Sequence, residues 1–213
     1  MPRPILPHLV ADLPVALPPE LATRLAAAFD VESKIPHALE ALGPVAGADV
    51  VHVNAGAGPR TCIAADLGAR VTDVTPVGLA NLPPSSADVV LGCWTWFRDD
   101  LAADLLAAER VLRPGGRLLV LHDYGRDDVS GLRSAELPEY TTWGRRDGWF
   151  LRTGFKVRVI HCWWTFASLE EAAAFLDEAF GEPGRTVAAG LKRPRLSYNV
   201  AIYHRAKGDA PAE

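Results

Sequence analysis

Short apolar runs recur through the middle of the chain, and segments with helical spacing separate them. The runs cover residues 49–54, Arg70–Val74, 87–92 and 117–122. They are nearly continuous rather than alternating, which is typical of parallel strands covered on both faces. Between the last two runs, leucines and alanines recur every three or four residues over 99–112, which predicts an amphipathic helix. Strands that alternate with helices favour an α/β fold.

Further elements flank this repeating part. Before it we expect a helix over 20–29 that follows two prolines, and a short amphipathic helix over 35–42 that Gly43 ends. A helix over 59–67 should follow the first strand. In the last third, Ser168 and Glu171 form a capping box that opens a helix ending near Phe180. Final strands are predicted over 155–161 and 196–204.

The predicted elements place the whole chain, residues 1–213, in one domain. We expect an N-terminal arm and helices over 1–45 and an α/β core over 46–124. The segment 125–154 is polar, charged and aromatic, so it is predicted to be a cap or loop region. A closing strand-helix-strand unit over 155–213 completes the domain, and its two strands should pair at one edge of the sheet.

Composition and charge narrow the classes of function. The net charge is −4, which argues against general nucleic-acid binding because that usually needs a basic face. The three cysteines, Cys62, Cys93 and Cys162, are widely separated and form no CxxC pair, as expected of reduced thiols in a cytoplasmic protein. No apolar run is long enough to cross a bilayer, and prolines interrupt the apolar N-terminus. We therefore expect neither nucleic acid nor a membrane as a partner.

The turn after the first strand is the most informative local feature. The sequence VVHVNAGAGP over 50–59 is an apolar strand that runs into a turn containing Gly56 and Gly58. Glycine tolerates positive φ and has no Cβ, so the backbone can pass close to a ligand there. At the mouth of a parallel sheet, such a turn is where α/β proteins bind nucleotide-like cofactors.

Three segments in order resemble the class I S-adenosylmethionine-dependent methyltransferases. They are VVHVNAGAG over 50–58, LPPSSADVV over 82–90 and ERVLRPGGRLLV over 109–120. They are similar to the family's glycine-rich first motif, to the approach to its fourth strand, and to its helix-turn-strand motif. The resemblance implies a Rossmann-like fold, with a mostly parallel sheet and helices on both faces, and S-adenosyl-L-methionine as cofactor.

The chain departs from the family pattern at several positions. His52 stands where the family has an acid in the first strand, and Asn54 replaces the first glycine of the loop. The acid that binds the ribose at the end of the second strand aligns with Thr75. Asp73 lies two residues earlier on the same side of the strand, so it could substitute only if the strand ends early.

The connection between the second strand and the next confident strand is short. Only residues 76–86 separate them, whereas a parallel crossover usually needs about a dozen residues. The family normally places a helix, a third strand and a further helix there. We therefore predict a sheet trimmed around strand 3 and a more open cofactor site.

The resemblance also implies the site residues. The cofactor would contact Asn54, Ala55, Gly56 and Gly58 in the loop, Asp73 or Thr75 at the ribose, and Cys93 and Trp94 after the fourth strand. Trp94 could stack on adenine or on an aromatic substrate. His122 and Tyr124, at the carboxyl end of a central strand, are the candidate catalytic bases.

Other ligands have weaker support. A nicotinamide dinucleotide would require a third glycine in the loop and an acid at the end of the second strand, and both are missing. No metal site is expected, because His52 and His122 should lie about 10 Å apart with no third ligand. A basic cluster could form a pocket for an anionic or aromatic substrate, or could be a solvated face over aromatic anchors; its members are Arg145, Arg146, Arg152, Lys156 and Arg158.

Two hypotheses of function remain open at this point. In the first, the chain is a methyltransferase that acts on an unidentified small molecule. It could form a homodimer through Trp163 and Trp164. Alternatively, it is a methyltransferase-like protein that has lost cofactor binding and serves as a binding or assembly module. The changes at His52, Asn54 and Thr75 and the short connection motivate the second hypothesis.

Overall fold

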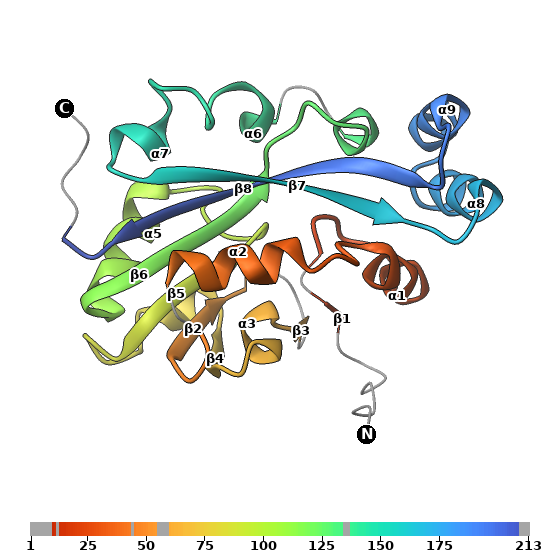
Figure 1. Cartoon of the computed structure of the whole chain (residues 1–213). Helices are drawn as coiled ribbons and strands as arrows, with labels where there is room; N and C mark the ends of the chain where they lie inside the picture. Colours follow the sequence, from red (N-terminus) through yellow and green to blue (C-terminus); the bar gives the residue numbers. More distant parts are fainter. Residues whose placement is uncertain (1–9, 12, 44, 55–59, 134–136, 209–213) are drawn as a thin grey trace.

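A six-stranded sheet forms the centre of the protein (Figure 1). The computed structural model describes residues 10–11, 13–43, 45–54, 60–133 and 137–208. The strand order is β4-β2-β5-β6-β8-β7. Every strand runs in the same direction except β8, which is antiparallel to both of its neighbours. The strands are β2 (Asp49–Val53), β4 (Arg70–Val74), β5 (Ala87–Cys93), β6 (Leu112–Asp123), β7 (Lys156–Thr165) and β8 (Arg195–Ala206).

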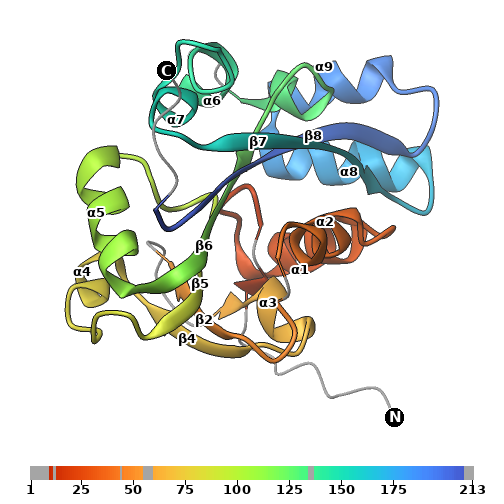
Figure 2. The ribbon, with the colours of Figure 1, turned by 60° about the vertical axis from the view of Figure 1, so that its left-hand side comes forward.

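Helices cover both faces of the sheet, as Figure 2 shows. On one face lie α1 (Pro19–Ala28), α2 (Lys34–Leu42) and α3 (Ile63–Asp66), and on the other lie α4 (Pro76–Leu79) and α5 (Leu101–Val111). Because neighbouring residues of a strand point to opposite faces, each strand contributes to two apolar cores. Val50 joins the core under α1 and α2, whereas Val51 joins the core under α5. The predicted α/β fold with helices on both faces is thus confirmed.

The trimmed sheet is also confirmed within the described residues. β4 is an edge strand of the six-stranded sheet, and the chain returns from it to β5 through the four-residue helix α4. Leu79 of α4 is fully buried, so this short connection still covers part of the sheet. β6 begins at Leu112, so the Pro114-Gly-Gly segment lies inside the strand, where the pairing with β5 is shifted and Gly115 adopts a φ of +75°.

The glycine-rich segment differs from the predicted helix over 59–67. Residues 55–59 lie outside the described residues. After them comes a two-residue strand, β3 (Arg60–Thr61), which pairs in parallel with β1 (Val10–Ala11). The helix α3 begins only at Ile63. Part of the expected N-terminal arm therefore lies beside the segment that follows the glycine turn.

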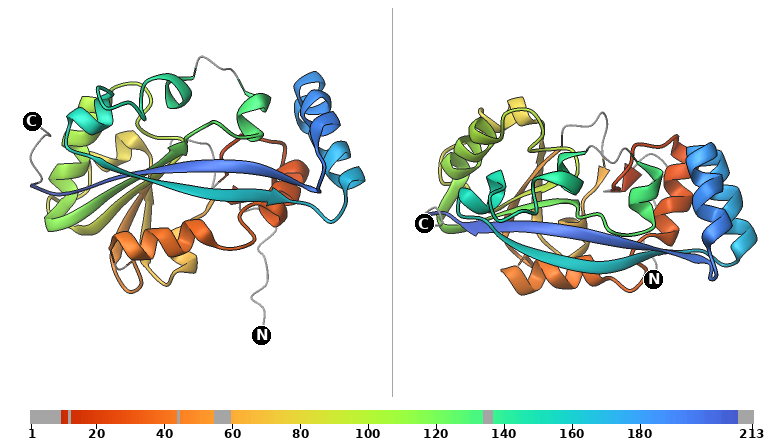
Figure 3. Two further views of the ribbon diagram at one scale, coloured as in Figure 1. Left: turned by 45° about the horizontal axis from the view of Figure 1, so that its top comes forward. Right: turned by 90° about the horizontal axis from the view of Figure 1, so that it is seen from above.

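The closing unit is larger than predicted. β7 and β8 pair over ten residues, and the half of β8 from Arg195 to Asn199 continues past the end of β6. Figure 3 shows this ribbon reaching the helices α8 (Leu169–Phe180) and α9 (Glu182–Gly190). The helix α9 was not predicted, because glycines interrupt its sequence. Trp163 and Trp164 lie within β7 rather than after it.

The described residues 125–133 and 137–154, which we call the cap, lie over the carboxyl end of β6. They contain the 3-10 helix η1 (Val129–Leu132) and the short helices α6 (Pro138–Thr141) and α7 (Trp149–Arg152). Trp143 of the cap is buried and meets Phe150 edge-on. Among the helices of the described residues, none combines the length and apolar character that a bilayer crossing requires.

Candidate functional site

The strand order reverses at the carboxyl ends of β2 and β5. The chain leaves β2 for β4 on one side and then crosses to β5 on the other. In open α/β sheets, ligands bind outside the carboxyl ends of the strands where the order reverses in this way. Asn54 directly follows β2, is buried, and its backbone N–H donates to the carbonyl of Val74 at 2.8 Å. Ala55, Gly56 and Gly58 lie outside the described residues, so their contact with a cofactor stays a prediction.

His52 and Asp73 form a pair close to this reversal of strand order. They are register partners on β2 and β4, and the Nδ1 atom of His52 lies 2.6 Å from Oδ1 of Asp73. Only 1% of the His52 side chain is exposed, whereas 55% of the Asp73 side chain is exposed. His52 stands where the methyltransferases have an acid, and an acid, Asp73, lies beside it on the neighbouring strand. The hydrogen bond from His52 orients the Asp73 carboxylate.

Thr75 has a structural role of its own. It is the N-cap of α4, and its Oγ1 accepts a hydrogen bond from the backbone N–H of Gly78 at 3.1 Å. β4 ends at Val74, so Asp73 is the penultimate residue of the strand. The strand therefore ends where the sequence predicted and not earlier, and a contact of Asp73 with the ribose stays a prediction.

Cys93 and Trp94 lie at the end of β5 but inside the protein. Both are almost fully buried, and Trp94 adopts a φ of +55°. Its indole N–H donates to the hydroxyl of Tyr198 at 2.9 Å, and its ring meets Phe29 edge-on at 5.8 Å. The structure therefore places Trp94 in the core under α1, and stacking on adenine would require this ring to leave that packing.

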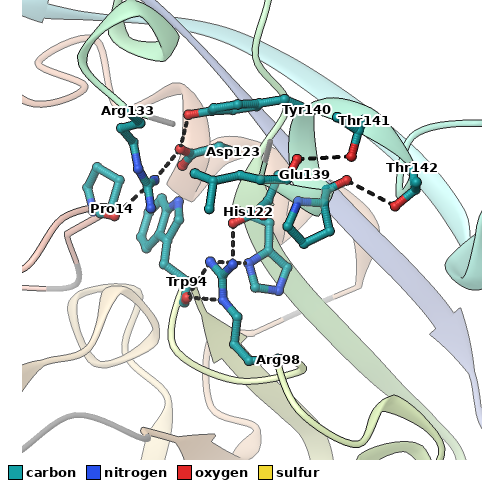
Figure 4. Close-up of polar contacts among 12 residues, drawn as sticks. Pro14, Trp94, Arg98, His122, Asp123, Arg133, Glu139, Tyr140, Thr141 and Thr142 are labelled. Carbon is teal, nitrogen blue, oxygen red and sulfur yellow. Dashed lines mark hydrogen bonds and ion pairs between the residues drawn. The ribbon is translucent and has the colours of Figure 1, made fainter. Parts of the chain in front are cut away.

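A buried carboxylate follows on β6. Asp123 accepts a hydrogen bond from Tyr198 at 2.5 Å. It also accepts one from Tyr140 at 2.7 Å and pairs with Arg133, as Figure 4 shows. Burial and then the negative charge of Asp123 raise the pKa of Tyr198 well above its ordinary value. The same two causes raise that of Tyr140. Both phenols therefore remain protonated donors, and the network ties the cap to β8.

His122 is fully buried and neutral. Its Nδ1 lies 3.3 Å from a guanidinium nitrogen of Arg98 (Figure 4). Its ring packs on that of Trp143, with ring centres 4.6 Å apart. Because arginine can only donate, Nδ1 accepts and the proton of the neutral ring is on Nε2. Burial, and after it the positive Arg98, lowers the pKa of His122 well below its ordinary value. In this position His122 holds Arg98 in place rather than meeting solvent.

Arg98 is the residue that the sequence analysis missed. It follows β5 by five residues, donates to the carbonyl of Trp94 and pairs with the buried Glu139 of α6. Its guanidinium also lies 5.4 Å from the ring centre of Trp143. An arginine after a Trp-Thr-Trp-Phe run gives no recognisable pattern, because its partners come from a cap segment far along the chain.

Tyr124, the second catalytic candidate, lies nearer to solvent. It is half-buried, lines a pocket together with Tyr140 and Gly144 of the cap, and its ring lies under the guanidinium of Arg126 at 5.7 Å. In the part of the chain that the structure describes, no group of three or more His, Cys, Asp or Glu side chains could hold a metal ion.

The fold is that of the class I methyltransferases. One similar solved structure, assigned as a type II methyltransferase from Anaeromyxobacter dehalogenans, is 19% identical; the match covers 84% of this chain and 96% of that one, with a TM-score of 0.52. Another, a S-adenosylmethionine-dependent methyltransferase from Geobacter sulfurreducens in complex with S-adenosyl-L-homocysteine, is 17% identical over 89% of this chain and 99% of that one, with a TM-score of 0.46. No protein-family model and no curated protein matches the sequence.

Proposed function

We propose that this protein is a S-adenosylmethionine-dependent methyltransferase that acts on a small molecule. The observation that carries the proposal is the reversal of strand order between β2 and β5 in a methyltransferase-like fold, with an oriented and half-exposed carboxylate, Asp73, near it. A crevice at such a reversal of strand order is the usual position of a nucleoside-containing cofactor.

The chemistry of Asp73 fits the ribose of this cofactor. Ribose hydroxyls are donors, and a carboxylate accepts strong hydrogen bonds. One oxygen of Asp73 is held by His52, which fixes the carboxylate while leaving its second oxygen to accept. Thr75 already caps α4 with its Oγ1, so we assign the ribose to Asp73 rather than to Thr75.

The bound cofactor would supply an electrophilic methyl group on its sulfonium. The protein's own residues would hold and position the reactants, which is the larger part of such a displacement. The loop after Asn54 would face the methionine part, and Tyr124 would contact the substrate. His122 would act through Arg98 as a positioning residue.

Titration calorimetry with S-adenosylmethionine and S-adenosylhomocysteine tests the proposal. We expect binding of both ligands, and about tenfold weaker binding by Asp73→Asn because a charged hydrogen-bond acceptor is lost. Asp66→Asn, which changes an exposed carboxylate of α3, is the matched control and should bind as the parent does.

Folded protein that gives no heat with either ligand up to millimolar concentration would contradict the proposal. The alternative hypothesis of a binding or assembly module would then account for the altered loop. If Asp73→Asn and Asp66→Asn bind S-adenosylmethionine with equal affinity, the protein binds this cofactor but Asp73 does not contact it.

A further inference from the structure

The strand β4 leaves one edge of the six-stranded sheet open. It is the outermost strand at the end away from β7, and within the described residues it pairs only with β2 (Figure 2). Thr72 and Asp73 are exposed, and 66% of the Arg70 side chain is exposed. The connection through α4 returns to β5 without adding a strand beside β4. An open strand edge presents backbone groups that can bind another strand.

The hydrogen bonds of β4 show which of its backbone groups face outward. The N–H of Arg70 and the carbonyl of Val74 both bond to the residues that flank β2, at 2.9 and 2.8 Å. Alternate residues of a strand direct their backbone groups to the same neighbour, so Thr72 also bonds to β2. The N–H and carbonyl groups of Val71 and Asp73 therefore point to the open edge.

A second copy of the same strand fits these groups. When two β4 strands run antiparallel about Thr72, Val71 of each copy lies opposite Asp73 of the other. Residues in such positions exchange both of their backbone hydrogen bonds, so every outward-facing residue is paired. Thr72 then faces Thr72 of the second copy, and threonine pairs across strands are favourable. A surface that meets its own copy in this way is typical of a symmetric dimer.

The charges of β4 suit the same arrangement. Arg70 begins the strand and Asp73 lies near its end, so antiparallel pairing brings the positive end of one copy beside the negative end of the other. Directly opposite each charge stands a valine, because Arg70 faces Val74 and Asp73 faces Val71 of the second copy. A register that set Asp73 against Asp73 would oppose like charges and is disfavoured.

A groove beside the edge offers an apolar contact to the second copy. It has a volume of about 380 Å³, and its walls include Val51, Leu82 and Pro83. It lies by Arg70, at the amino end of β4, on the face of the sheet that carries α4 and α5. Because the paired strands belong to one sheet, α4 of the second copy lies on this face and at this end. Its residue Val77 is 81% exposed, so an apolar side chain is available to enter the groove.

We propose that two copies of this chain form a symmetric dimer through their β4 edges, in antiparallel pairing centred on Thr72. One sheet then runs through both copies, and Val77 of each copy enters the groove of the other. The dimer does not depend on the proposed function. It places Arg70 of the second copy beside the end of β4 that carries Asp73, so the proposed cofactor site lies next to the interface.

A cysteine at the centre of the pairing tests its register. Position 72 and its copy would form a non-hydrogen-bonded pair with Cα atoms about 4.5 Å apart, which is within the range of a disulfide. The native cysteines are buried. We expect Thr72→Cys to give a disulfide-linked dimer in a glutathione redox buffer, as seen on a non-reducing gel. Thr23→Cys, at an exposed threonine of α1, is the matched control and should give no cross-link.

Sedimentation equilibrium measures the association itself. Thr72→Lys sets two ammonium groups against each other, and Val71→Pro removes an N–H that faces the edge while leaving the bonds to β2. We expect either change to raise the dimer dissociation constant at least tenfold, with an unchanged far-UV circular dichroism spectrum. Thr23→Lys should keep the constant of the parent. Val77→Ser should also weaken the dimer, whereas Val31→Ser, at another exposed valine, should not.

The outcomes separate this proposal from the proposed function. A parent chain that stays monomeric up to millimolar concentration would overturn the β4 dimer, even if it binds S-adenosylmethionine. A dimer that Thr72→Lys and Thr23→Lys affect equally, with no cross-link in Thr72→Cys, would also overturn it. A dimer that Thr72→Lys weakens, but that gives no heat with S-adenosylmethionine, would support the interface and contradict the methyltransferase function.

Discussion

At the scale of the residue, buried charged groups on β6 and in the cap hold the cap in place over the sheet. Asp123 is 1% exposed and accepts from Arg133, Tyr140 and Tyr198. A buried ion pair is costly to break on one side only, because the other charge then stays unpaired in a low dielectric. This network therefore fixes the position of the cap over the sheet.

We predict that Asp123→Asn lowers the free energy of unfolding by about 3 kcal/mol, because Arg133 loses its counter-charge and one tyrosine loses its acceptor. Urea denaturation measures this loss. The exposed Asp99→Asn is the control, and its effect should stay within about 0.5 kcal/mol. A change of the same small size at Asp123 would show that the network contributes no stability.

His122 leads to a prediction about pH. Its pKa is lowered in the folded protein, while the unfolded chain takes up a proton near pH 6.5. Above that pH both states are neutral, and below it only the unfolded state gains the proton. The free energy of unfolding should therefore fall as the pH drops from 7 to 5, by at most about 1.4 kcal/mol per pH unit from this group.

The variant His122→Asn isolates that contribution, because an amide oxygen can still accept from Arg98 but does not titrate. Its unfolding free energy should depend less on pH than that of the parent between pH 7 and 5. The variant of the exposed His161, His161→Asn, should keep the parent's dependence. A parallel pH profile for His122→Asn would contradict the buried, neutral histidine.

At the scale of the element, a close contact between two helices explains why the sequence did not predict α9. The helix α9 packs against α8 through Gly184, where a Cβ would lie 1.9 Å from the carbonyl oxygen of Leu176. Because only glycine permits this approach, the residue that weakens the helix in isolation is the one that allows it to pack. This is why helical propensity failed to predict α9.

We predict that Gly184→Ala destabilises the protein by about 3 kcal/mol, since the backbone of α8 cannot yield without a shift of the helix. Gly190→Ala in the same helix should change the stability by less than about 0.5 kcal/mol, because nothing lies within 4 Å of the added methyl. Both are measured by urea denaturation. Similar effects of the two substitutions would contradict the close approach of α8 and α9.

At the scale of the whole molecule, the order of the strands places the candidate site. The short return through α4 leaves β4 at the edge of the six-stranded sheet. The reversal of strand order between β2 and β5 is nevertheless preserved. Assignment as one domain, the possible homodimer and the cytoplasmic location stay predictions.

Cofactor binding should be visible in the stability of the whole chain. We predict that S-adenosylmethionine at a hundredfold excess over its dissociation constant raises the free energy of unfolding by about 2.7 kcal/mol, because it binds only the native state. Thermal denaturation followed by tryptophan fluorescence measures this as a rise in Tm. Adenosine triphosphate is the control, and an equal rise with it would speak against a site that recognises the sulfonium cofactor.

The sequence by itself determined the fold class, the positions of the parallel strands and the shortened connection, although β6 begins five residues before its predicted start. Continuous apolar runs, glycine turns and chain length are local properties, and for this reason Arg70–Val74 was predicted to the residue. Only the tertiary structure decided what the site residues touch. It paired His52 with Asp73 across two strands, placed Trp94 in the core, and brought Glu139 of the cap to Arg98. These contacts join residues far apart in sequence, and burial and charge pairing, which no local pattern records, set their chemistry.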